Sequence, residues 1–271
     1  MVSAGQVTPR RARTLCHVDL PCTSCLAQGV HVEVVPHVHQ LRAFGAQVFA
    51  LLGERVTLID TGGPGSGRAI LRQLRALGRR PDEIERIVLT HYHIDHRGAA
   101  AELQAVTGAD VLIHTSEAGY TRGSIAYPNP VQTRHRAALL EILHGAMRGR
   151  PLRIEELQDG QTIDVLGGLR VVHAPGHTRG SIALELPEQR LLLSGDTMGF
   201  RWGILETPDP VVSEDVEEAK ASIERLATLD VDTIAFSHFQ PLRRGAQRAI
   251  ERLVETWRPR EEWEARIEAE H

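Results

Sequence analysis

The chain has 271 residues, and its 31 lysines and arginines against 35 acidic residues give a net charge of −4. With 42% hydrophobic and 24% charged residues, its composition is that of a globular protein rather than a disordered one. No apolar run approaches the roughly 20 residues of a membrane span, and no apolar stretch follows the N-terminal arginines, so we expect no membrane association and no secretory signal. The weakly acidic balance gives no electrostatic reason to expect a nucleic-acid partner.

Residues 1–30 differ from the rest of the chain. They are polar and basic and hold all three cysteines, Cys16, Cys22 and Cys25. An odd number of cysteines argues against a disulfide framework, so we expect a reducing cytoplasm. Cys22 and Cys25 have the spacing of metal ligands, with Cys16 and His17 nearby, but a second ligand pair is missing unless these two supply it. We therefore expect an N-terminal extension that is either poorly ordered or carries a small metal site.

From about residue 31 the pattern predicts short strands and amphipathic helices. In chain order, strands are expected at 31–35, 47–52 and 55–60, a helix at 70–77, a strand at 86–90, a helix at 97–107 and a strand at 110–113. Further strands are expected near 162–166, 169–173, 181–186 and 190–194, then a helix at 213–228 capped by Ser213, a strand at 231–236 and a helix at 243–257.

Residues 115–150 break this rhythm. An apolar helical stripe there includes Leu143 and Met147. We expect this segment either to cover the substrate site or to pack on the sheet.

The two halves of the chain show the same order of polar residues after predicted strands. In the first half one strand ends at Asp60 and a later strand leads to His91, and in the second half the corresponding residues are Asp196 and His238. Runs of strands followed by helices, given twice, predict two packed sheets with helices outside.

The densest group of chemically reactive side chains is His91–His96, where four candidate metal ligands fall within six residues after a short apolar strand. This spacing does not suit a helical face, which needs ligands three or four residues apart. In an irregular loop His91 and His93 can converge on one ion, while Asp95 and His96 turn toward a second. Imidazole and carboxylate ligands without thiolate suit zinc and, less exclusively, iron or manganese. The alternative is a polar surface loop, but the carboxyl end of a buried strand is where active sites form in α/β sheets.

The chain contains 14 histidines, more than its phenylalanines, tyrosines and tryptophans combined, and several of them fall in ordered motifs. These motifs are His91-x-His93-x-Asp95-His96, Ala174-Pro-Gly-His177-Thr-Arg-Gly-Ser181, Ser194-Gly-Asp196-Thr and Ser237-His238. In this order, after a strand that ends at Asp60, they resemble the metallo-β-lactamase-fold hydrolases. The resemblance implies an α/β fold, a four-layer αββα sandwich of two mixed β-sheets flanked by helices, in a hydrolase domain over residues 31–271.

The resemblance also implies two metal positions, with two zinc ions as the expected cofactor and iron or manganese as alternatives. The first position is assigned to His91, His93 and His177, the second to Asp95, His96 and His238, and Asp196 would bridge them. Asp60 would orient a ligand loop, as carboxylates do toward metal-bound imidazoles. Two ions lower the pKa of a shared water, so that hydroxide attacks an acyl carbonyl or phosphorus near neutral pH. Asp95 would pass a proton to the leaving group, which makes Asp95 and Asp196 the expected catalytic carboxylates.

Departures from family patterns narrow the expected substrate. In true metallo-β-lactamases the bridging position is not Asp, so Asp196 argues against antibiotic hydrolysis. Acyl-homoserine lactonases place a Tyr shortly after the bridging Asp, and this chain has none there. The residues expected to line the substrate pocket are Tyr92, Phe200, Trp202, Leu143 and Met147, and their apolar character favours a neutral or acyl substrate over a polyanion.

We therefore expect a binuclear zinc hydrolase acting on a small ester, thioester or lactone, as a monomer or a homo-oligomer. Three alternatives stay open at this point. One is an oxidoreductase that resembles the iron-dependent persulfide dioxygenases and uses a single iron. The others are a phosphodiesterase of the same fold and a binding protein without activity.

Overall fold

A computed structural model describes residues 31–122, 152–259, 261–262 and 265. Within these residues a seven-stranded sheet has the order β1-β2-β3-β4-β5-β6-β7. Its strands are β1 Val32–Val35, β2 Val38–Leu41, β3 Val48–Leu52, β4 Val56–Ile59, β5 Ile84–Leu89, β6 Asp110–His114 and β7 Ile154–Leu157. Strands β1 to β4 pair antiparallel, and β4 to β7 pair parallel, so the sheet is mixed.

The second sheet within the described residues has the order β14-β11-β10-β9-β8. Its strands are β8 Thr162–Ile163, β9 Leu169–His173, β10 Ile182–Leu186, β11 Leu191–Leu193 and β14 Thr233–Ala235. All of its pairs are antiparallel except β11 with β14, which is parallel. A separate hairpin joins β12 Gly199–Arg201 to β13 Ile204–Glu206.

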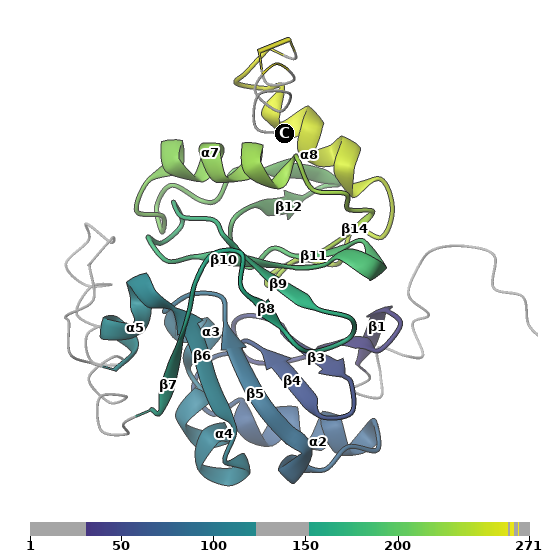
Figure 1. Cartoon of the computed structure of the whole chain (residues 1–271), viewed down its shortest axis with the longest axis vertical. Coiled ribbons are helices and arrows are strands. Elements are labelled where there is room, and N and C mark those ends of the chain that lie inside the picture. Colours follow the sequence, from purple (N-terminus) through teal and green to yellow (C-terminus); the bar gives the residue numbers. More distant parts are fainter. Residues whose placement is uncertain (1–30, 123–151, 260, 263–264, 266–271) are drawn as a thin grey trace, which may run out of the picture. The chain divides into compact units, whose positions relative to one another are not determined.

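Helices cover the outer faces of the two sheets (Figure 1). The helices are α2 Gly67–Ala76, α3 Ile94–Arg97, α4 Ala100–Thr107, α5 Thr115–Thr121, α7 Val216–Leu226 and α8 Ala246–Val254. Helices α2 and α4 pack on the seven-stranded sheet, and α7 and α8 pack on the five-stranded sheet. The predicted four-layer αββα sandwich of two mixed sheets is therefore confirmed.

The strands alternate between two buried faces, as strands in the middle of a layered fold must. On β5, Val88 points into the core between the two sheets, while Ile87 and Leu89 point toward the core under α2 and α4. On β11, Leu193 points into the core between the sheets and Leu192 toward α7 and α8. Each sheet is thus apolar on both faces, so its polar side chains gather where the strands end.

Several element boundaries differ from the sequence expectation. The helix expected at 97–107 begins later, at Ala100, and the short helix α3 places Asp95 and His96 in a helical turn instead of the irregular loop expected there. Gly98 lies between α3 and α4, where a Cβ would collide with Pro64 and the Ile94 carbonyl. The expected cap at Ser213 is wrong, because α7 begins after Asp215, whose carboxylate accepts a hydrogen bond from the Glu218 amide at 3.0 Å. The N-terminal extension, with its three cysteines, and most of the segment 115–150 lie outside the described residues.

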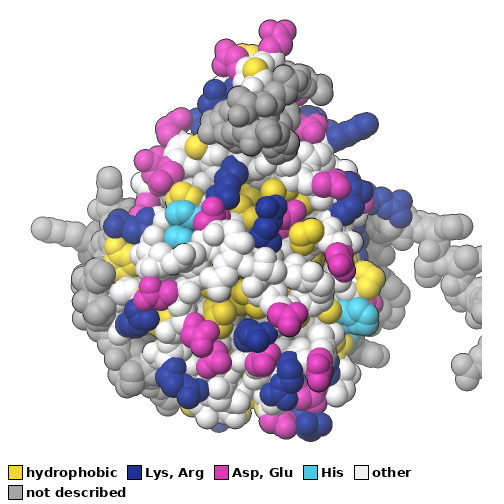
Figure 2. All heavy atoms as spheres, in the orientation of Figure 1, with side chains coloured by type: hydrophobic (Ala, Val, Ile, Leu, Met, Phe, Trp, Pro, Cys, Tyr) yellow, Lys and Arg dark blue, Asp and Glu magenta, His cyan; other side chains and the backbone are white. Residues whose placement is uncertain are grey.

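The outer surface of the described residues carries acidic and basic side chains interspersed over the face shown in Figure 2. None of the helices described is long and apolar enough to span a bilayer.

Candidate metal centre

The candidate site lies where strands of the two sheets end, and the parallel pairs set its position. Strands β4 and β5 run parallel, so Asp60 and the segment after β5 emerge at one edge of the first sheet. Strands β11 and β14 run parallel in the second sheet, so Asp196 and His238 emerge together there. The loop after β9 brings in His177. All seven residues assigned as ligands from the sequence meet at this place: His91, His93, Asp95, His96, His177, Asp196 and His238.

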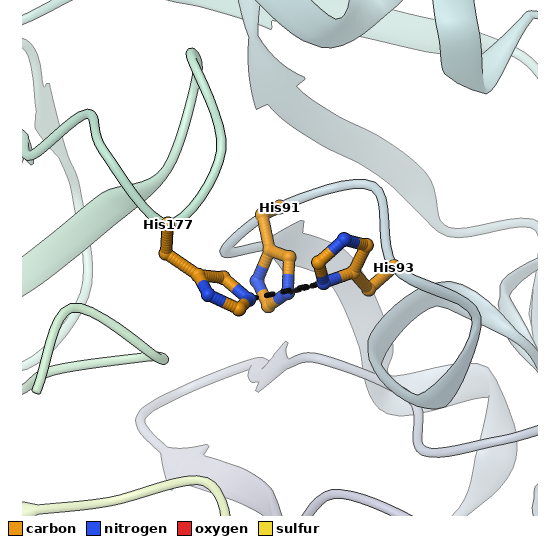
Figure 3. A group of neighbouring side chains, drawn as sticks. All are labelled: His91, His93 and His177. Atoms are coloured by element: carbon orange, nitrogen blue, oxygen red, sulfur yellow. Dashed lines mark hydrogen bonds between the residues drawn. The ribbon is translucent and has the colours of Figure 1, made fainter. Parts of the chain in front are cut away.

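Three of these residues form a group of imidazole nitrogens that face one another (Figure 3). The His93 Nδ1 atom lies 3.0 Å from His91 Nε2 and 3.0 Å from His177 Nε2. The His91 and His177 rings lie edge to face, with their centres 4.8 Å apart. His91 and His177 are buried, so two of the three imidazoles are shielded from solvent.

Hydrogen bonds on the far side of two rings fix which nitrogen carries the proton. The Ser213 hydroxyl donates to the Asp209 carbonyl at 2.7 Å, so it accepts from His177 Nδ1 at 3.1 Å. The Thr90 hydroxyl donates to the Asp60 carboxylate at 2.8 Å, so it accepts from His91 Nδ1 at 3.1 Å. Both rings therefore direct the lone pair of Nε2 into the site, which is the tautomer that a metal ligand needs.

Asp196 lies between this group and the remaining residues. Its Oδ2 atom is 3.5 Å from His177 Nε2, 3.3 Å from His96 Nε2 and 3.2 Å from His238 Nε2. Asp95 Oδ2 is 3.5 Å from His238 Nε2 and 3.8 Å from His96 Nε2. Asp196 thus contacts histidines of both groups, as a bridging ligand must.

Asp60 holds His96 from behind. Its Oδ2 atom lies 2.8 Å from His96 Nδ1, and its Oδ1 atom accepts from the Thr90 amide at 2.8 Å. Asp60 is buried and adopts a left-handed backbone conformation with φ of 61°. This contact directs His96 Nε2 toward Asp196, and among the described residues that buried nitrogen has no well-formed hydrogen bond.

Burial and neighbouring charges shift the pKa values of several groups in this site. Burial lowers the pKa of His91 well below its ordinary value, with His96 and His93 adding to the effect, so His91 is neutral at pH 7. Burial raises the pKa of Asp196, but His96 and His238 outweigh this and hold the pKa well below the ordinary value. Burial lowers the pKa of His96, and Asp196 and Asp60 raise it by more, because the two carboxylates favour a positive charge beside them. A divalent cation would supply positive charge to these carboxylates, and the donor set of imidazole and carboxylate suits zinc.

A cavity of about 730 Å³ opens onto the candidate ligands. Tyr92 lines it as predicted, but the Tyr92 hydroxyl donates to Glu214 Oε1 at 3.2 Å. The wall beyond Asp196 includes Met198, Arg201, Glu206, Pro208, Val212 and Phe239.

Two residues expected in the substrate pocket lie elsewhere. The Phe200 ring stacks on Phe236 with their centres 5.2 Å apart, against the core under α7 and α8. Trp202 is 93% exposed at the turn between β12 and β13. Strand β12 alternates its side chains, so Arg201 faces the cavity while its neighbours do not. Leu143 and Met147 lie outside the described residues.

Thr90 and Ser213 were not expected in the site. Both are hydroxyl residues that orient a candidate ligand, and Ser213 lies 36 positions from His177 in the chain. The position of Thr90 directly before His91 was the one feature of the sequence that pointed to Thr90.

Comparison with known proteins gives a consistent result. The family model of the metallo-beta-lactamase superfamily matches residues 43–238. The probable metallo-hydrolase YflN of Bacillus subtilis is 26% identical over 82% of this chain and 91% of its own. Hydroxyacylglutathione hydrolase of Dechloromonas aromatica is 31% identical over 68% of this chain and 53% of its own.

Among solved structures, the metallo-beta-lactamase family protein TTHA1429 of Thermus thermophilus superposes with a TM-score of 0.64 at 26% identity. The match covers 88% of this chain and 82% of the other. The matched family segment spans the motifs from the region before Asp60 to His238, as the sequence resemblance implied. The chain belongs to the metallo-beta-lactamase superfamily.

Proposed function

We propose that this chain is a metal-dependent hydrolase that holds two zinc ions and cleaves a small ester, thioester or lactone. The observation that carries the proposal is the meeting of seven imidazole and carboxylate side chains, five of which line one cavity. These side chains come from separate segments of the chain. A polar surface loop or a binding pocket without a metal would not need so many imidazole and carboxylate groups to converge from separate segments.

The two ions would be held by the groups that the geometry defines. His91, His93 and His177 would hold one, Asp95, His96 and His238 would hold the other, and Asp196 would lie between them. Two bound ions lower the pKa of a water to near neutrality and polarise the carbonyl of a substrate.

The protein's own residues orient this site and control what enters it. Asp60 and Thr90 hold His96 and His91, and Ser213 holds His177, so the ligands are set before an ion binds. Asp95 lines the cavity, and its side chain is 36% exposed. This position lets Asp95 carry a proton between the site and a leaving group. The Tyr92 hydroxyl is already bonded to Glu214, so we assign it to the wall rather than to the reaction.

The cavity wall supports a neutral acyl substrate. Met198, Val212 and Phe239 supply apolar surface. Arg201 and Glu206 are 4.0 Å apart and offset each other's charge, and Asp209 adds a negative charge that disfavours an anionic substrate. The similarity to a hydroxyacylglutathione hydrolase supports a thioester among the three classes.

The test is an activity screen with the metal content measured on the same sample. Purified protein is analysed for zinc, iron and manganese and assayed with aryl esters, thioesters, lactones and phosphodiesters. We expect about two zinc ions per chain and turnover of at least one acyl substrate class that stops on chelation and returns with zinc. Phosphodiesters as the preferred substrates would refute the acyl assignment. One iron with oxygen uptake would refute hydrolysis.

A further inference from the structure

A buried glutamate outside the ligand set joins the two loops that carry the three-histidine group. Glu117 lies in the first turn of α5, and its side chain is completely buried. Its Oε1 atom accepts a hydrogen bond from the Gly180 amide at 3.1 Å, and the Thr178 hydroxyl donates to the same oxygen. Both partners lie in the loop that follows His177.

The same carboxyl group also reaches the loop of the other two histidines. The backbone amide of Tyr92, which lies between His91 and His93, is close enough to Glu117 to lower the pKa of its carboxyl group. One side chain therefore touches the His91–His93 loop and the His177 loop together, although 61 positions separate Glu117 from Thr178.

The surroundings show that this contact is closely fitted. A Cβ at Gly180 would collide with the Glu117 side chain, so only glycine allows the loop to approach α5 this closely. Thr178 bonds in turn to Ser181, with the two hydroxyl oxygens 2.8 Å apart. One turn further along α5, the Tyr120 ring packs on Tyr92 with their centres 5.3 Å apart.

An ordinary structural ion pair does not explain Glu117. None of the ion pairs found among the described residues involves it, whereas the buried Glu224 pairs with Arg258 at 2.7 Å. Burial raises the pKa of Glu117 to about 8. Burying a carboxyl group without a counter-charge is costly unless it is hydrogen-bonded, and the hydrogen bonds of Glu117 go to the loop that follows His177.

We propose that Glu117 is a positioning residue that sets the separation of the His91–His93 loop from the His177 loop and thereby the fit of the three-histidine group to a metal ion. The proposal rests on the function proposed above, since it assumes that these histidines bind an ion. Loss of Glu117 leaves the Gly180 amide and the Thr178 hydroxyl without this hydrogen-bond acceptor. The distance between the two loops is then less well fixed, and so are the positions of His91, His93 and His177.

The test measures metal binding directly. Metal-free wild type, Glu117→Ala and Glu117→Gln are titrated with Co²⁺, which is followed by its absorption spectrum, with a competing chelator to extend the range. We expect Glu117→Ala to weaken one of the two Co²⁺ sites by about 10–100-fold and to alter its spectrum, as loss of an orienting group does. Glu117→Gln keeps an oxygen acceptor for the Gly180 amide and the Thr178 hydroxyl, so its affinity should stay within about threefold of wild type, well under the orienting-group effect.

Glu224→Ala is the matched control, because Glu224 is also a buried glutamate but bonds to Trp257 and Arg258 instead. It should lower the melting temperature and leave Co²⁺ affinity unchanged. Thr178→Val removes the hydroxyl that donates to Glu117 and so tests the same contact. This variant also serves as the test if Glu117→Ala does not fold. It should weaken the same Co²⁺ site, and the double variant with Glu117→Ala should be no weaker than the worse single variant.

Two results would overturn the proposal. One is wild-type Co²⁺ affinity in Glu117→Ala, or in Thr178→Val where the alanine variant does not fold. The other is an equal loss of affinity in Glu224→Ala, which would show that general destabilisation is the cause. Wild-type protein that binds no Co²⁺ would instead refute the function proposed above.

Discussion

Asp60→Asn is the substitution that tests the orientation of His96 most selectively. Asp60 accepts hydrogen bonds from the Thr90 amide, the Thr90 hydroxyl and His96 Nδ1, each at 2.8 Å. Asparagine has the same size, and its oxygen can keep the amide bond. Its NH₂ group then replaces the oxygen that faces the other two donors.

The magnitude follows from these contacts. Leaving a buried donor unpaired costs about 1–3 kcal/mol, so the metal-free variant should lose on the order of 2–3 kcal/mol of unfolding free energy. The asparagine NH₂ group would face the Nδ1–H group of His96, and the imidazole avoids this clash of two donors by carrying its proton on Nε2. Nε2 is the nitrogen assigned to the metal. We therefore expect zinc affinity to fall by about 10–100-fold, or about 1.4–2.8 kcal/mol.

The assay combines urea denaturation of the metal-free protein with zinc competition against a chelator. Asp230→Asn is the control, because Asp230 forms an exposed pair with Arg190 far from the ligands in the fold, and it should change neither quantity measurably. Zinc affinity equal to wild type in Asp60→Asn would refute the reasoning that Asp60 sets the His96 tautomer.

Three further changes are predicted. Asp196→Ala removes the carboxylate that contacts both groups of histidines and should abolish at least 99% of turnover, on the order of the loss of an essential catalytic group. The variant should lose one metal equivalent and keep the circular dichroism spectrum of the wild type. Normal turnover at normal metal content would contradict the bridging role. Trp202→Ala should leave kcat/KM within about threefold and stability within about 0.5 kcal/mol, because the side chain is 93% exposed; a large rise in KM would return Trp202 to the substrate pocket. Burial raises the pKa of Glu117 from 4.5 to about 8, so the folded protein holds one more proton than the unfolded chain between those values, and stability falls as pH rises through this range. Glu117→Gln cannot titrate, so the unfolding free energy of this variant minus that of the wild type should increase from pH 5 to pH 8. A constant difference across this range would show that Glu117 does not titrate there.

The layered fold could be predicted because the strong signals in the sequence are local. Short apolar runs that end at polar residues mark β4, β5, β11 and β14, and their order places the candidate ligands. Strand β2 was missed because its interior holds His39 and Gln40, which are buried but polar. Strand β7 was missed because two glutamates in its middle are exposed.

The candidate ligands could be proposed from the sequence because each falls in a short motif after a strand. The residues that orient them could not, because their roles depend on contacts between distant segments. Ser213 had the features of a helix cap, and only the fold brings it to His177. Glu117 is an unremarkable acidic residue in the sequence, and its burial depends on the loop that packs over α5.

Metal analysis of active protein, with activity followed as the ions are removed and returned, decides whether hydrolysis depends on the metal centre. We predict about two zinc ions per chain, loss of hydrolysis on chelation and full recovery when zinc is restored. Hydrolysis that continues in metal-free protein would contradict a metal-dependent reaction.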